Sequence, residues 1–323
     1  MKKIKLIEVK SEIGAGTRGA SMGIDALRVA CYDKGSDYFK RFNSIEVPNQ
    51  NEVLFDPNPF PNAKYIDAVL TVQKAIAKTV YNTINLDMFP LVLAGDHGNA
   101  AGTIAGIKQA YPDKTLGVIW VDAHADIHSP YTSPSGNMHG MPLAASLSID
   151  NLECKRNDPA PETVFFWESL KKVGGEQPKL KPEHLVYIVV RDTEQEEDFL
   201  ISKHQIKNIT KGELLEKAAA TVAREAMERL KDCDLIYVSF DVDSLDSKFS
   251  KGTGTPVEVG LTVDEAKELC YNLVKDPRVC CFEMVEINPT LDTENTMAEN
   301  AFDILEYATQ AIEERLSNSV ELA

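Results

Sequence analysis

Short apolar runs recur along this chain at intervals that leave room for a helix between them. Five of them are continuous rather than alternating in polarity, which is typical of parallel strands that are covered on both faces. We therefore predict five buried strands. They are LVLAG at 91–95, LGVIWV at 116–121, LVYIVV at 185–190, LIYVSF at 235–240 and RVCCFEMV at 278–285.

Helix-like segments separate these runs. Segment 212–230 is rich in strong helix formers, and segment 296–316 is amphipathic. Strands that alternate with helices form parallel crossover units, so the fold class we predict is α/β, a doubly wound, mostly parallel sheet flanked by helices. A further helix is predicted because apolar residues recur every three or four positions at Tyr65, Val69, Val72, Ile76 and Val80.

The polar, proline-containing stretch 149–162 is the main interruption of this alternation. Because strands and helices continue on both sides of it, we interpret it as a long surface loop rather than a domain boundary. We therefore expect residues 1–323 to form a single domain, which at this length can bury a sizeable core.

Charge and composition exclude several classes of partner. The chain has 50 acidic and 34 basic residues, a net charge of −16 that repels phosphate backbones and anionic lipids. No apolar run approaches the roughly 18–20 residues that cross a bilayer, and the start MKKIKLIEVK lacks the apolar core of a signal peptide. Six scattered cysteines without metal-site spacing fit buried, reduced thiols. We expect a cytoplasmic protein that binds neither nucleic acid nor membrane.

Histidines and aspartates gather directly after three of the predicted strands, in the motifs AGDHG, WVDAHADIH and VSFDVDSLD. Extended backbone points alternate residues to one face, so the spacing i, i+2, i+4 in WVDAHADIH lets three side chains converge. Ligands of parallel sheets collect beyond the carboxyl ends of the strands. The candidate metal ligands are His97, Asp122, His124, Asp126, Asp241 and Asp243.

Four carboxylates and two imidazoles in one crevice imply bound cations, because the carboxylates would otherwise repel one another. One such motif alone is usually a loop or capping pattern, but three together favour a metal site. The oxygen-rich set favours two Mn²⁺ over Zn²⁺, while Co²⁺ or Ni²⁺ could occupy the same cage. Two ions about 3.5–4 Å apart can share a bridging water, lower its pKa and present hydroxide as a nucleophile.

At these residues the sequence resembles the ureohydrolase family of arginases, agmatinases and their relatives, and it is most similar to arginase. Matching motifs span nearly the whole chain: AGDHG, GVIWVDAHADIH, SGNMHGMP, VYIVVRD, SFDVDSLD, TGTPVEVGLT and MVEINP. The resemblance implies that two Mn²⁺ share Asp122 and Asp241 as bridging ligands. It places His97 and Asp126 on one ion, and His124 and Asp243 on the other.

The resemblance also assigns two catalytic residues, His139 in SGNMHG and Glu286 in MVEINP. Both fit the chemistry of a guanidino substrate. A carboxylate such as Glu286 can orient the permanently charged guanidinium through a bidentate contact. An imidazole such as His139 can protonate the leaving amine. Alone, each would be unremarkable, because a loop histidine or a glutamate at a strand end often has no catalytic role.

Substrate recognition is expected in the loop that follows the metal motif. By position, the resemblance assigns the substrate's α-carboxylate and α-amino group to His128, Ser135, Asn137, Glu194 and Glu197. Arginases usually carry asparagine where this chain has His128, and aspartate where it has Glu194. Either change could loosen the grip on arginine, although an imidazole still donates to a carboxylate and glutamate keeps the charge.

We predict hydrolysis of L-arginine to L-ornithine and urea by a metal-bridging hydroxide. Agmatinase, formiminoglutamase or another guanidino ureohydrolase remain alternatives, as does a catalytically silent metal-binding relative, which would be expected to have lost a ligand. A deacetylase of related fold would need a different, single-metal set. The glycine-rich loop 14–23 lacks the lysine of a phosphate-binding loop and receives no catalytic role. A homo-oligomer is compatible with the sequence.

Overall fold

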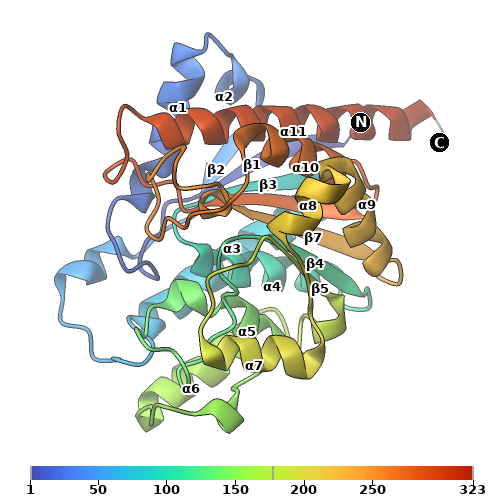
Figure 1. Cartoon of the computed structure of the whole chain (residues 1–323). Coiled ribbons are helices and arrows are strands. Elements are labelled where there is room, and N and C mark those ends of the chain that lie inside the picture. The colour runs from blue at the N-terminus through green and yellow to red at the C-terminus, as the bar shows by residue number, and fades with distance from the viewer. Residues whose placement is uncertain (1, 177, 322–323) are drawn as a thin grey trace.

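A sheet of eight parallel strands lies at the centre of the computed structural model, which describes residues 2–176 and 178–321 (Figure 1). The strand order is β2-β1-β3-β8-β7-β4-β5-β6, and every described pair is parallel. The strands are β1 Lys3–Val9, β2 Ser44–Glu46, β3 Met88–Ala94, β4 Leu116–Val121, β5 Leu185–Ile188, β6 Lys207–Ile209, β7 Leu235–Asp241 and β8 Val279–Val285.

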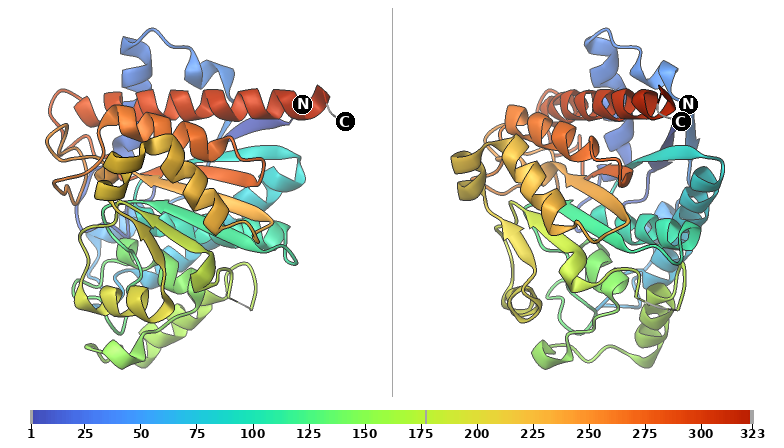
Figure 2. Two further views of the ribbon diagram at one scale, coloured as in Figure 1. Left: turned by 45° about the vertical axis from the view of Figure 1, so that its right-hand side comes forward. Right: turned by 90° about the vertical axis from the view of Figure 1, so that its right-hand side faces the viewer.

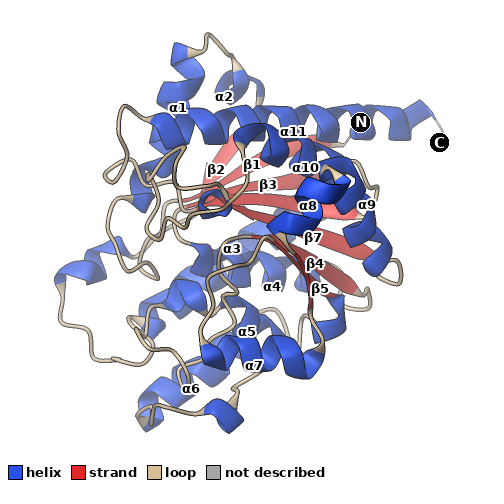
Figure 3. Ribbon diagram, in the orientation of Figure 1, coloured by secondary structure: helices blue, strands red, loops and turns tan. Residues whose placement is uncertain are grey.

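Helices cover both faces of this sheet. Figure 3 shows the strands in red, enclosed between blue helices. In every view of Figures 1 and 2, α11 lies above the sheet and α5 and α6 lie below it. Buried apolar side chains form one core on each face. The helices are α1 Gly23–Asp33, α2 Tyr38–Arg41, α3 Ile66–Asn85, α4 Ala100–Ala110, α5 Pro142–Leu147, α6 Pro161–Lys171, α7 Gln195–His204, α8 Lys211–Lys217, α9 Ala219–Arg229, α10 Val263–Val274 and α11 Thr296–Glu321.

The predicted fold class and all five predicted strands are confirmed, but the sheet contains three strands that we did not predict: β1, β2 and β6. Strand β1 escaped notice because Lys3, Lys5 and Glu8 interrupt its apolar run. In the fold, Glu8 is buried and its carboxylate accepts hydrogen bonds from Arg28 at 2.6 and 2.7 Å. A buried charge is tolerated when it is paired in this way.

Two local expectations need correction or refinement. Segment 212–230 is two helices, α8 and α9, because the chain turns at Ala218, whose φ of 67° is in the left-handed region that no helix interior adopts. Segment 149–162 is mostly loop, as predicted, but it contains a short 3₁₀ turn at Leu152–Cys154 and the start of α6. All six cysteines are free. Among the described helices, none is long and apolar enough to cross a membrane.

The sheet order determines where the candidate site forms. Strands β3, β8, β7 and β4 are consecutive neighbours in the sheet, although β3 and β4 are separated from β7 and β8 by more than a hundred residues of chain. Each of the four carries a predicted site residue at its carboxyl end or within three residues of it: His97, Glu286, Asp241 and Asp122 respectively. Because all four strands run in the same direction, these residues meet at one edge of the sheet.

Candidate metal centre and substrate cavity

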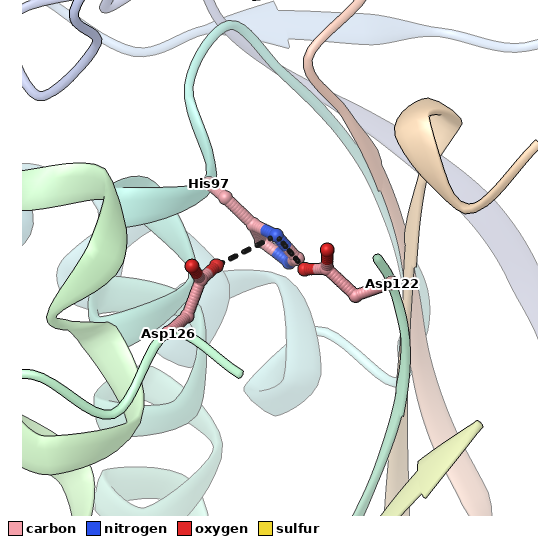
Figure 4. A group of neighbouring side chains, drawn as sticks. All are labelled: His97, Asp122 and Asp126. Carbon is pink, nitrogen blue, oxygen red and sulfur yellow. Dashed lines mark ion pairs between the residues drawn. The ribbon is translucent and has the colours of Figure 1, made fainter. Parts of the chain in front are cut away.

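Three carboxylates surround one nitrogen of His97. The Nδ1 atom lies 2.8 Å from Asp122 Oδ2, 3.0 Å from Asp241 Oδ2 and 3.2 Å from Asp126 Oδ2. Figure 4 shows Asp122 and Asp126 approaching this atom from opposite sides. His97, Asp122 and Asp126 supply ligand atoms close enough together to hold one metal ion.

The other side of the His97 ring is fixed by the protein. Its Nε2 lies 2.8 Å from Ser239 Oγ, and the ring stacks on Trp120 with centroids 3.8 Å apart and planes 2° from parallel. When Nε2 donates its hydrogen to Ser239, Nδ1 carries a lone pair that points toward the three carboxylates. Such a partner on the far nitrogen is the usual way in which a protein sets the tautomer of a metal-binding histidine.

A second group lies beside the first and shares Asp122 with it. His124 Nδ1 lies 2.9 Å from Asp243 Oδ2 and 3.6 Å from Asp122 Oδ1. The Asp243 carboxylate is held by the backbone N–H of Ala123 and the hydroxyl of Thr255, which donate to its two oxygens at 3.1 and 3.0 Å. Asp122, His124 and Asp243 could therefore hold a second metal ion next to the first.

Backbone strain accompanies two of these side chains. Asp126 has a φ of 50° and Glu286 a φ of 68°, and both are L residues with a side chain in a region that favours glycine. Each such residue costs roughly 1–3 kcal/mol and persists only where the surrounding structure demands it. Here the strained conformation turns both carboxylates toward the same space beyond the strand ends.

The carboxylates cannot all be ionised together without a compensating charge. Burial, followed by repulsion from Asp122, raises the pKa of Asp126 to about 6. Burial and repulsion from Asp243 raise the pKa of Asp241 well above its usual value. Burial would raise the pKa of Asp122 as well, but the close contacts with His124 and His97 outweigh it and hold that pKa low. A shift of this kind in a cluster of carboxylates is relieved when cations bind.

Two atoms at the centre of the first group support this interpretation. His97 Nδ1 and Asp122 Oδ2 are completely buried and lie 2.8 Å apart, but within the described part of the chain their contact lacks the geometry of a hydrogen bond and no other hydrogen bond reaches either atom. Buried polar atoms are rarely left unpaired in proteins unless water or an ion satisfies them. The donor set and these two atoms therefore fit a pair of divalent cations.

A cavity of about 310 Å³ opens onto these ligands. Twelve of the thirteen predicted site residues line it; the exception, Asp122, has no exposed surface and lies beneath it. Lining residues that the sequence interpretation did not select are Ser133, Pro134, Gly140, Asp192 and Thr255.

His139 and Glu286 face each other across the wall of this cavity. His139 Nδ1 lies 3.3 Å from Glu286 Oε1, which also accepts the backbone N–H of His97 at 2.8 Å. Among the described residues, Glu286 Oε2 has no hydrogen-bond donor. Although burial opposes it, the hydrogen bond with Glu286 raises the pKa of His139 to about 9. In the metal-free protein, His139 is therefore a protonated imidazolium at neutral pH.

The two residues that depart from the arginase pattern contact each other at the rim of the cavity. His128 Nε2 lies 3.1 Å from Glu194 Oε2, and this contact lowers the pKa of Glu194 to about 2. Glu197 is 3% exposed and completes the N-terminal capping box of α7, accepting the backbone N–H of Glu194 and, from the other oxygen, that of Ile127. His128, Glu194 and Glu197 also form a third group close enough to chelate a cation.

The sequence interpretation missed the residues that support the site from outside it. Ser239 and Trp120 lie within predicted strands, where they were counted only as part of an apolar run. The polar residue in LIYVSF was the available signal for Ser239. Lys64, which donates to Asn137 Oδ1 at 2.9 Å, lies 73 positions from its partner, and no local pattern links the two.

The chain is similar to known arginases over nearly its whole length. The model of the arginase family matches residues 2–310. An arginase of Brevibacillus brevis is 35% identical over 309 residues, which cover 94% of this chain and 96% of that protein. The native structure of the arginase from Bacillus caldovelox superimposes with a TM-score of 0.81 at 34% identity, covering 95% of this chain and 98% of that one.

A more distant likeness extends to formimidoylglutamase from Bacillus subtilis, with a TM-score of 0.74 at 22% identity over 97% of this chain and 87% of that one. This likeness concerns the fold alone. The family model and the curated relatives, in contrast, cover nearly all of the chain. The chain therefore belongs to the arginase family of hydrolases.

Proposed function

We propose that this protein hydrolyses the guanidinium C–N bond of L-arginine to give L-ornithine and urea, with two Mn²⁺ as cofactors. The observation that carries the proposal is the pair of ligand groups that share Asp122 at the floor of the cavity. Curated relatives similar over nearly the whole chain are named arginase. The predominance of carboxylate oxygen among the ligands favours Mn²⁺ over Zn²⁺.

The residues would divide between two cations. His97, Asp126 and the shared Asp122 and Asp241 would hold one, and His124 and Asp243 would complete the other with the same two bridging aspartates. When bound, such cations act as Lewis acids and lower the pKa of water toward neutrality. Around them, Ser239 and Thr255 keep the ligands His97 and Asp243 oriented through hydrogen bonds.

Glu286 is placed to bind the substrate's guanidinium. Its Oε1 is engaged by the His97 backbone, while Oε2 is left for a ligand in the cavity. A guanidinium offers N–H groups to a carboxylate and stays protonated at physiological pH, so a charge-assisted hydrogen bond forms without any proton transfer. The hydrogen bond from the backbone N–H of His97 holds this carboxylate beside a proposed metal ligand, so a guanidinium bound to Glu286 would lie close to the metal centre.

His139 is placed to protonate the departing amine. The amine of ornithine leaves readily only as a neutral molecule after it receives a proton, and an imidazolium held by Glu286 can donate one. The side chain keeps one-fifth of its surface exposed, on the cavity side. It can therefore exchange protons with solvent between turnovers.

A panel of guanidino substrates tests the proposal. The protein is stripped with a chelator and reconstituted with Mn²⁺, Co²⁺ or Ni²⁺, and urea or ammonia release is measured from L-arginine, agmatine, 4-guanidinobutyrate and formiminoglutamate. We expect L-arginine to have the highest kcat/KM, with Mn²⁺ as the best cofactor. Turnover of agmatine or another compound in preference to arginine would overturn the substrate assignment. Absence of turnover with every metal would identify a silent relative.

A further inference from the structure

Lys64 makes two hydrogen bonds to the loop that carries Asn137. Its backbone N–H donates to Gly136 O at 2.8 Å, and its Nζ donates to Asn137 Oδ1 at 2.9 Å. Lys64 lies two residues before α3, which packs closely against α4 and belongs to the core of one sheet face. The wall of the cavity at Asn137 is thereby tied to a rigid element rather than to another loop.

The charge of Lys64 is not neutralised by an acidic neighbour. Within residues 2–176 and 178–321, the Asn137 amide is the partner of its side chain, and no carboxylate forms an ion pair with it. In a chain with a net charge of −16, this half-buried lysine contacts a residue that lines the cavity and has no acidic partner among the described residues. An uncompensated cation at such a position attracts an anionic group of a ligand.

The contact also determines what Asn137 can offer a ligand. With Oδ1 engaged by Lys64, the free hydrogen-bonding group of the side chain is the amide NH₂, which can only donate. This nitrogen lies against Gly16, where a Cβ atom would come within 2.7 Å of it. Because residue 16 has no side chain, the NH₂ group stays uncovered. The glycine-rich loop 14–23 thus acquires a role that its sequence did not reveal.

We propose that Lys64 is a positioning and specificity-determining residue of this cavity: it fixes the Asn137 amide as a hydrogen-bond donor and adds the positive charge that selects substrates bearing a terminal carboxylate. This inference rests on the proposed function and names the group that distinguishes arginine from agmatine. On the other side of the rim, Glu194 and Glu197 are already engaged by His128 and by the α7 capping box. With these two glutamates engaged, the terminal carboxylate of the substrate is the group that Lys64 and Asn137 are best placed to recognise.

Steady-state kinetics of Lys64→Met with L-arginine and agmatine test the inference. We expect KM for L-arginine to rise about tenfold, the usual effect of losing one charged hydrogen-bond contact, with kcat unchanged. For agmatine, which has no carboxylate, kcat/KM should stay within twofold. Lys64→Arg should recover most of the affinity for arginine. Lys74→Met, on the exposed face of α3, is the matched control and should alter neither substrate.

Gly16→Ala tests the same Asn137 amide, but at its nitrogen rather than at its oxygen. The added methyl group would meet Asn137 Nδ2, so we expect the same selective rise in KM for L-arginine. Circular dichroism and melting temperature establish that each variant is folded. Equal losses with arginine and agmatine, or a fall in kcat with unchanged KM, would mean that Lys64 is merely structural and would overturn the inference.

A binding measurement separates this inference from the proposed function. Calorimetry with L-ornithine and putrescine, which differ by the carboxylate, requires no turnover. Suppose that the wild-type protein does not hydrolyse arginine, but Lys64→Met lowers the affinity for ornithine and leaves that for putrescine unchanged. The inference is then supported and the proposed function fails. If arginine is hydrolysed and the variant binds both amines as the wild type does, the inference fails and the function stands.

Discussion

The floor and the rim of the cavity are built in different ways. At the floor, His97, Asp122 and Asp241 follow central strands, are almost fully buried and are oriented by backbone N–H groups or buried side chains. At the rim, His128 and Glu194 lie in loops, and Glu194 keeps half of its side-chain surface exposed. The contact between His128 and Glu194 joins two side chains, neither of which is held by a strand end.

The floor therefore tolerates less change than the rim if the reaction is to be kept. Moving a floor ligand would disturb the sheet and both ligand groups at once, because Asp122 is shared between them. Exchanging a rim residue changes one loop contact. In agreement, the two residues assigned to substrate recognition that depart from the arginase pattern, His128 and Glu194, both lie at the rim, where they contact each other. Substitutions at the floor should therefore have larger effects than substitutions at the rim.

The largest effect is expected at a shared floor ligand. In the proposed centre Asp241 is a ligand of both cations, so Asp241→Asn should lower kcat/KM by about a thousandfold and decrease bound Mn²⁺. Urea release and atomic absorption measure the two effects. Asp198→Asn, an exposed change on α7, serves as control. Full metal content together with full activity would contradict the role given to Asp241.

Substitution of His139, the proposed proton donor, should impair catalysis without impairing metal binding. In His139→Asn the metal ligands stay intact, so we expect kcat to fall about a hundredfold while KM and metal content change little. His204→Asn, at the end of α7, is the control. If the loss of activity is matched by a loss of metal, His139 belongs to the metal centre, and its assignment as proton donor is wrong.

The floor should also make the metal-free protein sensitive to pH. The pKa of Asp126 is raised to about 6 in the folded state from 3.8, so the folded state binds the proton more tightly. This contribution to stability is complete below pH 3.8 and is lost as the pH rises through 6, up to about 3 kcal/mol. Chelated protein should melt several degrees lower at pH 7.5 than at pH 5, and Mn²⁺ should restore more stability at the higher pH.

The control for this pH effect is Asp126→Asn, which cannot ionise at residue 126. In that variant the metal-free melting temperature should depend less on pH between 5 and 7.5. Scanning calorimetry of the chelated wild type and variant gives the comparison directly. An identical pH dependence in both proteins would show that other groups are responsible.

The smallest effect is expected at the exposed rim. Glu194→Gln keeps a hydrogen bond to His128 but removes the charge of a half-exposed carboxylate, and contacts of half-exposed charged groups contribute at most about 1 kcal/mol. We expect KM for L-arginine to change by no more than about threefold and kcat to stay constant. A thirtyfold increase in KM would instead identify Glu194 as a direct ligand of the substrate's amino group, and the floor and the rim would then be equally constrained.

Much of the floor could be predicted from the sequence because its rules are local. A continuous apolar run identifies a buried strand, and alternate residues after it point the same way, so Asp122, His124 and Asp126 are recognisable within five residues. The resemblance then extended the prediction to His139 and Glu286, which the fold brings to within 3.3 Å. Every predicted residue except the buried Asp122 lines the cavity.

Which distant residues act together depends on how the strands and helices are arranged in space. The sheet order that places β8 and β7 between β3 and β4 brings the ligand groups into contact, and no single segment encodes it. Charged side chains interrupt the apolar pattern of β1, so the strand was not predicted. The left-handed backbone of Ala218 divides a segment that helix propensity alone predicts to be one helix. The contacts of Lys64 and Gly16 with Asn137 join segments far apart in the chain. Side-chain contacts of this kind depend on the packing of whole elements, which local patterns do not specify.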